Sequence, residues 1–300
     1  IIALPRTRML KLRQKPAHSR AMEGKAQSQC GEGIFLEFDL KKIWLKCGRA
    51  GGYPAKEPAL LAADLLFPRR CPVCGGAAGE YLGGDIVLPK GRLICPGCLK
   101  KLSFVTPPVC MKCGKEIGSE LQEYCPDCLR RPRSFEYGMA LLNYNKTAAA
   151  SMAAVKYRNK REYLDFYARA AAVRFGERIR ASGIQRIVPV PVHPSRFRKR
   201  GFNQAEELAG RLSQELQIPA AGLLLRVKKT DPQKGLGAGG RLKNLAQAFQ
   251  ALPEAKNWER VLLVDDIYTT GSTAEACTRA LLNAGVKKVY FFAVCIGHGR

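Results

Sequence analysis

The chain has 300 residues, 46% of them hydrophobic, and a formal net charge of +25 from 50 basic and 25 acidic side chains. This length and apolar share support about two domains with a sizeable core, and the charge favours a polyanionic partner: nucleic acid, a phosphorylated substrate or an anionic membrane surface. Because no apolar run approaches the roughly 20 residues that cross a bilayer, and the start has no signal-peptide pattern, we expect a soluble cytoplasmic protein rather than a membrane-spanning one.

Residues 1–57 lack a consistent hydrophobic periodicity and are rich in Lys, Arg, Gly and scattered Pro. The apolar patch 34–38 fits a short strand, but no nearby segment is suited to pair with it. We predict a disordered basic tail over residues 1–57 and interpret it as a candidate translated extension upstream of the folded domains. A short apolar helix at residues 60–67 should begin the folded part.

The segment 58–132 is nearly neutral and holds cysteines in Cys-x-x-Cys pairs. They are Cys71, Cys74, Cys95, Cys98, Cys110, Cys113, Cys125 and Cys128. In a reducing compartment such pairs are typical of metal ligands, and a redox role is the main alternative. Two pairs close a four-thiolate tetrahedral site with no open position, which suits a structural zinc ion. We therefore predict a double zinc ribbon with two structural zinc ions. Sequential grouping is the simplest, and cross-braced grouping stays open.

From residue 133 the pattern changes to α/β. Residues 136–144, 187–192 and 286–296 are apolar enough for strands. Between the first two lie Ala-rich helical stretches at 147–158 and 162–179. Their basic residues Lys156, Arg158, Lys160 and Arg161 suit contact with a phosphate, but we interpret them as a solvated face. The sequence predicts a second domain over residues 133–300 that is built around a parallel sheet.

Two basic clusters lie in this second domain, where residues 133–300 carry net +15. The first follows the strand 187–192 and contains Arg196, Arg198, Lys199 and Arg200. The second brackets a glycine-rich stretch and contains Lys228, Lys229 and Arg241. These side chains suit either a pyrophosphate group or a nucleic-acid backbone, and the sequence does not separate the two. His193 we interpret as a loop residue bonded to the backbone rather than as a base.

The stretch 261–273 carries the strongest chemical pattern. An apolar run at residues 261–264 predicts a buried strand, and Asp265 and Asp266 should lie at its carboxyl end, where open α/β sheets bind ligands. The turn that follows should present free backbone N–H groups and hydroxyls to a phosphate at the start of a helix. It consists of Thr269, Thr270, Gly271, Ser272 and Thr273. A diol-binding pair of carboxylates beside a phosphate-binding turn describes a site for a ribose 5-phosphate.

The sequence VLLVDDIYTTGST resembles the phosphoribosyl-pyrophosphate (PRPP) loop of type I phosphoribosyltransferases. The resemblance implies that Asp265 and Asp266 are the catalytic residues and hold the ribose hydroxyls, that residues 269–273 hold the 5-phosphate, and that Mg²⁺ accompanies PRPP. By position, residues 192–201 would form the pyrophosphate loop and residues 230–241 the mobile loop that shields the reaction.

The stretch VPVPVHPSRFRKRGFNQAEELA resembles the motif of the ComF family, whose members join a zinc ribbon to a phosphoribosyltransferase-like domain. The segment FEYGMALLNYNKTAAASMAAVKYRNK and residues 225–249 continue the similarity, which spans roughly residue 60 to the C-terminus. It implies a Rossmann-like type I phosphoribosyltransferase fold with a small N-terminal double zinc-ribbon module.

The family resemblance implies a role in DNA uptake during natural transformation, with the protein acting on or binding single-stranded DNA. An enzyme of this kind would transfer the phosphoribosyl group of PRPP and release pyrophosphate. The alternative is a nucleic-acid-binding or ligand-sensing module without turnover. A third hypothesis makes the ribbon a dock for other DNA-uptake components. No segment indicates the acceptor substrate.

Overall fold

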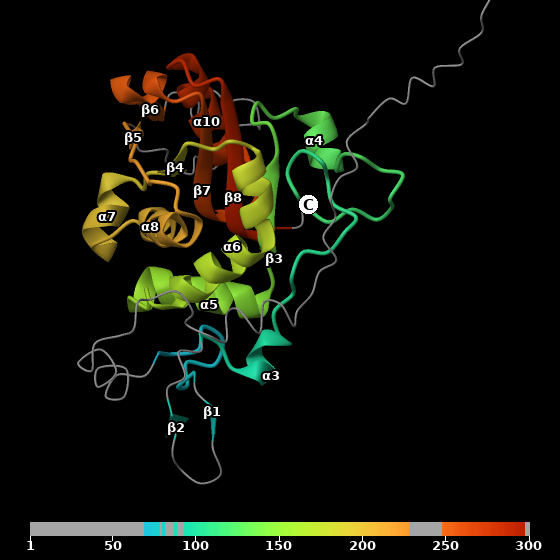
Figure 1. The fold of residues 1–300 in the computed structure, drawn as a ribbon, viewed down its shortest axis with the longest axis vertical. Coiled ribbons are helices and arrows are strands. Elements are labelled where there is room, and N and C mark those ends of the chain that lie inside the picture. Colours follow the sequence, from blue (N-terminus) through green and yellow to red (C-terminus); the bar gives the residue numbers. More distant parts are fainter. Residues whose placement is uncertain (1–68, 79, 82–86, 89–92, 228–247, 298–300) are drawn as a thin grey trace, which may run out of the picture. The chain divides into compact units, whose positions relative to one another are not determined.

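The computed structural model describes residues 69–78, 80–81, 87–88, 93–227 and 248–297, all of which belong to one compact unit (Figure 1). The predicted tail over residues 1–57 and the predicted helix at 60–67 lie outside the described residues. So do Lys228, Lys229 and Arg241. The predicted boundary between the two domains stays a prediction.

A four-stranded parallel sheet forms the centre, in the order β3-β8-β7-β4. Its strands are β3 (Gly138–Asn143), β8 (Lys288–Ile296), β7 (Arg260–Tyr268) and β4 (Arg186–Pro189). Nearly every side chain of these strands is buried, as expected for a parallel sheet covered on both faces. The strands predicted from the apolar runs are confirmed, and their carboxyl ends meet at one edge of the sheet.

Helices cover both faces of the sheet. They are α5 (Lys146–Arg158), α6 (Tyr163–Ala181), α8 (Gln204–Leu216) and α10 (Ser272–Asn283). Leu262 and Val264 of β7 belong to a core cluster with α5, α6 and α8, whereas Val261 and Leu263 belong to a cluster with α10. Because alternate residues of a strand point to opposite faces, the two clusters are the two sides of the sheet.

Smaller elements complete the described domain. They are the antiparallel pair β5 (Leu224–Arg226) and β6 (Phe249–Ala251), a 3₁₀ turn η1 (Pro253–Asn257), and α7 (Pro194–Arg200).

The interpretation of residues 192–201 as a loop was wrong for most of that range, because the helix α7 occupies residues 194–200. Pro194 occupies the first turn of α7, Gly201 ends it, and His193 Nδ1 accepts the Ser195 N–H at 3.1 Å. The interpretation of His193 as bonded to the backbone is thus confirmed.

The cysteine-rich part contains the short hairpin β1 (Glu80–Tyr81) and β2 (Val87–Leu88) and the helices α3 (Pro96–Leu99) and α4 (Pro126–Arg130). The chain between the two cysteine groups runs along the outer edge of β3: Val105 N–H donates to Leu141 O at 3.1 Å, and Asn143 N–H donates to Ser103 O at 2.7 Å. This pairing covers a strand edge that would otherwise expose unpaired backbone groups.

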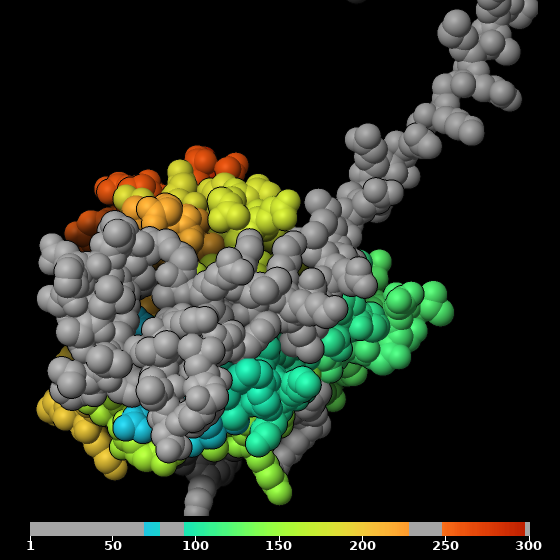
Figure 2. Space-filling model, turned by 60° about the horizontal axis from the view of Figure 1, so that its bottom comes forward, coloured from blue at the N-terminus to red at the C-terminus, as the bar shows by residue number. Residues whose placement is uncertain are grey.

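The two cysteine groups pack on opposite faces of the sheet. Cys71 and Cys98 belong to the core cluster of α6, and Cys110, Cys113 and Phe135 belong to the cluster of α10. In the space-filling view the second group lies in the green part of the chain, which projects at the right (Figure 2). Among the described helices, none is long and apolar enough to cross a bilayer.

Candidate active site and zinc centres

The described cysteines form two groups of four. Cys71, Cys74, Cys95 and Cys98 make one, and Cys110, Cys113, Cys125 and Cys128 make the other, with the sulfur atoms of each group within 4.8 Å of one another. The structure thus adopts the sequential grouping and not the cross-braced one.

The sulfur spacing fits zinc. A tetrahedron with Zn–S bonds of about 2.3 Å has S···S edges of about 3.8 Å, and the distance is 3.8 Å between Cys74 Sγ and Cys95 Sγ and 3.6 Å between Cys113 Sγ and Cys125 Sγ. Four thiolates leave no open position, so these clusters are consistent with two structural zinc ions. All four cysteines of the second cluster are buried, whereas Cys74 in the first is exposed.

The two acidic residues of the predicted PRPP loop lie inside β7 and not beyond it. The strand continues to Tyr268 because its pairing with β8 persists, from Asp265 opposite Ala293 to Tyr268 opposite Ile296. The prediction that the apolar run ends the strand was therefore wrong by several residues. Both carboxylates nevertheless belong to the carboxyl half of a central strand.

Asp266 has a buried carboxylate. Its exposed fraction is 5%. Oδ2 forms an ion pair with Lys156 Nζ from α5, and Oδ1 accepts a hydrogen bond from Gln204 Nε2 at the start of α8, at 3.2 Å. Lys156 is itself largely buried, so the interpretation of this lysine as part of a solvated face was wrong.

Asp265 lies in a different electrostatic environment. Its Oδ1 accepts the backbone N–H of Asp266 at 2.8 Å. Burial, followed by the neighbouring charge of Asp266, holds the pKa of Asp265 well above its ordinary value. The buried Cys277 of α10 and Arg226 of β5 are close enough to interact with this carboxylate. A carboxylate with a raised pKa in the carboxyl half of a central strand is a candidate for ligand or metal binding, because a cation there would restore its charge.

The turn after β7 leads directly into α10. Gly271 is the N-cap residue of the helix that begins at Ser272, adopts a left-handed conformation with φ of 73° and has no side chain to cap the helix. Thr270 Oγ1 accepts the Ser272 N–H at a long distance of 3.5 Å. Thr269 and Thr270 are exposed, while the hydroxyls of Thr270 and Ser272 lie 3.0 Å apart. Uncapped N–H groups together with the positive end of the helix dipole suit a phosphate group.

The predicted basic cluster lies on α7, where Arg196, Arg198 and Lys199 are exposed. Arg200 turns inward: its Nη1 donates to Gln204 Oε1 at 3.0 Å, and Gln204 in turn donates to Asp266. A continuous polar path therefore joins the basic helix to the acidic end of β7. The structure brings together an acidic pair, an uncapped helix and a basic helix, which can bind a molecule with phosphate groups and a diol.

Family models match two parts of the chain: the double zinc ribbon domain over residues 62–129 and the phosphoribosyl transferase domain over residues 203–300. Competence protein F of Haemophilus influenzae is 34% identical over 213 residues, which cover 69% of this chain and 91% of that protein. The chain belongs to the ComF family.

Two further relatives of this ComF chain match with similar coverage. The DNA utilization protein YhgH of Escherichia coli (strain K12) is 28% identical over 67% of this chain and 89% of its own length. Competence protein ComFC of Bacillus subtilis (strain 168) is 25% identical over 66% of this chain and 82% of its own length. Among solved structures, adenine phosphoribosyltransferase from Leishmania tarentolae covers 48% of this chain and 74% of its own, at 13% identity and a TM-score of 0.26, a value too low to carry an argument.

The ComF chain places several residues at the site that the sequence did not indicate. Gln204 donates to Asp266, and Arg226 is close enough to interact with Asp265. Both lie in stretches that resemble the ComF family, but the sequence assigned neither of them a role at the site. Lys156 sits among other basic residues of α5, so only the three-dimensional pairing distinguishes it. Since Lys156 and Asp266 are far apart in the chain, their pairing could have been found only from covariation or from a structure.

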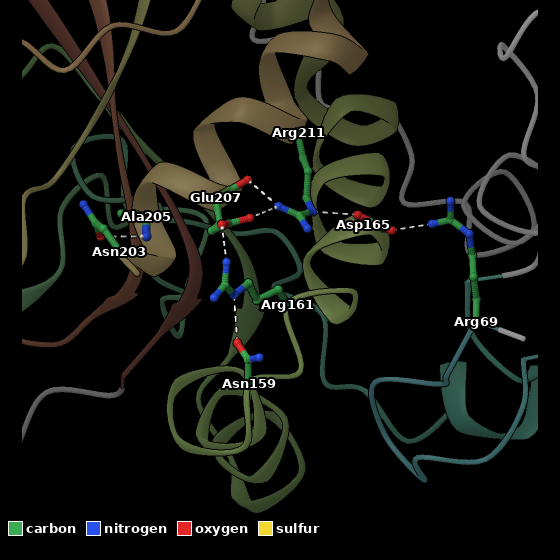
Figure 3. A network of polar contacts seen from close by, with 8 residues as sticks. All are labelled: Arg69, Asn159, Arg161, Asp165, Asn203, Ala205, Glu207 and Arg211. Atoms are coloured by element: carbon green, nitrogen blue, oxygen red, sulfur yellow. Dashed lines mark hydrogen bonds and ion pairs between the residues drawn. The ribbon is translucent and has the colours of Figure 1, made fainter. Parts of the chain in front are cut away.

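A second polar network lies away from the acidic pair and joins elements of the ComF chain (Figure 3). Arg211 of α8 donates to Asp165 of α6 and to Glu207, each at 2.6 Å. Asp165 also pairs with Arg69 beside the first cysteine cluster, and Glu207 accepts from Arg161 at 3.2 Å. These contacts tie the first ribbon to α6 and α8 and have a structural role.

Proposed function

We propose that this ComF-family protein binds PRPP with Mg²⁺ at the carboxyl edge of its sheet and acts in the uptake and handling of single-stranded DNA in the cytoplasm. The observation that carries the PRPP site is the position of Asp265 and Asp266 in the carboxyl half of β7, whose following turn leads into the N-terminus of α10. The competence and DNA-utilization names of the relatives support the wider role.

In this proposal the 5-phosphate lies against residues 269–273 and the ribose hydroxyls face Asp265 and Asp266. The exposed cations of α7 hold the pyrophosphate, with Lys228, Lys229 and Arg241 as further contributors. Mg²⁺, when bound with PRPP, neutralises part of the pyrophosphate charge. If a nucleophile attacks the anomeric carbon, a bond forms to that carbon while its bond to pyrophosphate breaks, and the basic residues of α7 stabilise the charge on the leaving group.

Calorimetric titration of PRPP with Mg²⁺ tests the site. We expect saturable binding by the zinc-loaded protein and loss of binding in the double variant Asp265→Asn/Asp266→Asn. Glu254→Gln removes an exposed carboxylate on η1 and serves as the control, which should bind as the wild type does. PRPP affinity in the double variant equal to that of the wild type, or no binding by a folded wild type, would refute the proposal.

If PRPP binds, release of pyrophosphate in the presence of single-stranded DNA distinguishes an enzyme from a binding module.

The basic surface independently favours nucleic-acid binding without turnover. Phe197 is 47% exposed between basic residues of α7, and Tyr157 is 67% exposed with its ring 5.1 Å from the Arg200 guanidinium. Exposed aromatic rings between cations are typical of surfaces that bind single strands, because bases stack on the rings while the cations contact phosphates.

Salt titration of oligothymidylate binding tests this second function. Replacing Arg196, Arg198 and Lys199 by Gln should weaken binding and make log K less dependent on log salt by about 2, because each lost phosphate contact changes the slope by roughly 0.7 for single strands. Phe197→Ala should weaken binding by about 1–3 kcal/mol and leave the slope unchanged. An unchanged slope in the triple variant would place DNA elsewhere.

The second ribbon offers a surface for other DNA-uptake components. Met111, Leu121 and Leu129 are large apolar side chains that are more than half exposed on it. If this surface is a dock, replacing Met111, Leu121 and Leu129 by Ser in the zinc-loaded protein should abolish partner binding and leave the PRPP affinity unchanged.

A further inference from the structure

The chain that leaves the second cysteine cluster contacts the turn before α10. Arg133 lies between α4 and β3, is only 7% exposed, and its Nη2 donates to the backbone oxygen of Thr270 at 2.6 Å. Within the described ranges no carboxylate pairs with this guanidinium, and its Nε is buried without a hydrogen-bond partner. A buried and unneutralised charge is costly to a fold unless it meets an anion.

The next residue fixes the first turn of α10. The backbone N–H and the hydroxyl of Ser134 both donate to the carboxylate of Glu275, at 2.8 and 2.6 Å. Glu275 is 4% exposed and also accepts from Arg279 at 2.6 Å, while its own N–H donates to Gly271 O at 2.9 Å. The start of α10 is therefore bonded to the ribbon segment on one side and to its own turn on the other.

The segment that leaves the second cysteine cluster also packs toward the turn before α10 through a row of three aromatic rings. The Phe135 ring lies 5.8 Å from that of Phe291, which lies 5.3 Å from that of Tyr268. Tyr268 is buried directly against Gly271. All three rings share a core cluster with Cys113 and Cys125, so the second metal cluster and the turn belong to one packed unit.

The contact of Arg133 with Thr270 has a directional consequence. In a trans peptide the C=O and the following N–H point to opposite sides. By holding the Thr270 oxygen on the ribbon side, Arg133 turns the Gly271 N–H toward the opposite side. That orientation suits a bound oxyanion.

We propose that the segment leaving the second ribbon is a built-in part of the phosphate site. Arg133 orients the Thr270–Gly271 peptide toward a phosphate monoester dianion held by residues 269–273 and adds a buried positive charge behind that turn, while Ser134 anchors α10 through Glu275. The proposal deepens the function above and rests on it for the identity of the ligand. In this proposal, the role of the second zinc ion is to hold Arg133 against the turn.

The test uses ribose 5-phosphate as the probe and the full, zinc-loaded chain. Arg133→Met should weaken ribose 5-phosphate binding about 10- to 100-fold, the range for losing a charge-assisted hydrogen bond, and Arg133→Lys should recover part of the loss. Arg131→Met removes an exposed arginine two residues earlier and should bind as the wild type. In the ligand-free protein, amide hydrogen exchange at residues 270–272 should be faster in both Arg133 variants, with zinc content unchanged.

Wild-type affinity and exchange in Arg133→Met would overturn the proposal. If Arg133→Met does not fold, Arg133→Lys decides: wild-type affinity together with wild-type exchange at residues 270–272 in that variant would overturn the proposal. A wild type that binds ribose 5-phosphate but not PRPP would refute the PRPP function and leave the phosphate role of Arg133 standing. A wild type that binds neither would refute both.

Discussion

Replacing glycine by alanine at three positions should change the free energy of unfolding by amounts that differ in sign and size. At Gly271, with φ of 73°, the left-handed backbone costs an alanine about 1–2 kcal/mol. The added Cβ would also overlap the Tyr268 hydroxyl and lie 2.6 Å from its Cζ. Tyr268 is 4% exposed and packs on Phe291, so it has little room to move, and overpacking adds about 1–3 kcal/mol. The expected loss in the free energy of unfolding is about 2–5 kcal/mol.

The two other glycines separate these contributions. Gly201 has φ of 77° with no atom within 4 Å of an added Cβ, so Gly201→Ala should cost only the backbone share, about 1–2 kcal/mol. Gly210 lies within α8 with equally open surroundings, and Gly210→Ala should stabilise by about 1 kcal/mol. Denaturant unfolding of the three variants gives the comparison. If Gly271→Ala lost no more stability than Gly201→Ala, the tight packing of Gly271 against Tyr268 would be refuted.

Three more predictions follow from the acidic pair and the metal clusters. Because burial raises the pKa of Asp265, the folded state holds its proton more tightly than the unfolded state, and stability should fall as pH rises from the ordinary carboxyl range through the raised pKa. Relative to the wild type, Asp265→Asn should therefore become more stable as pH rises, by about 1.4 kcal/mol for each unit that separates the folded-state pKa of Asp265 from its unfolded-state pKa. Denaturant melts at several pH values measure this difference, and a stability gain that does not change with pH would contradict the prediction. Lys156→Met should destabilise by about 3–5 kcal/mol, because Asp266 is left buried and unpaired, and adding Asp266→Asn should restore part of the loss; additive effects in this double-mutant cycle would refute the coupling. Cys113→Ser, in the fully buried cluster, should lower thermal stability more than Cys74→Ser, whose sulfur is exposed, with one zinc ion lost in each case by metal analysis; equal losses would contradict the burial argument.

The parts of this protein that follow from local pattern could be predicted from the sequence. Continuous apolar runs indicated the central strands because a strand covered on both faces has no polar side to show. The Cys-x-x-Cys spacing limited the cysteines to tetrahedral clusters, although only the fold could choose between sequential and cross-braced grouping. The assignment of residues 269–273 to a phosphate stays a prediction, and it rests on the residues that a helix N-terminus needs to bind an anion.

The remaining features depend on long-range packing. Arg133 and Thr270 are separated by 137 residues, and nothing in the Arg-Pro-Arg-Ser sequence indicates their contact. The extension of β7 through Asp265 and Asp266 depends on its pairing with β8, which allows charged residues inside a strand where apolar pattern alone would end it. The helix α7 is a different case. Pro194 and Gly201 are standard signals for the start and end of a helix, so the sequence could have predicted α7 where we expected a loop.

The position of bound PRPP and Mg²⁺ in a crystal structure of the zinc-loaded protein tests the central claim most directly. The account predicts the 5-phosphate against the backbone of residues 269–273, the ribose hydroxyls beside Asp265 and Asp266, and the pyrophosphate toward α7. PRPP bound on another surface, or an empty turn at saturating PRPP with the loop free of lattice contacts, would contradict it.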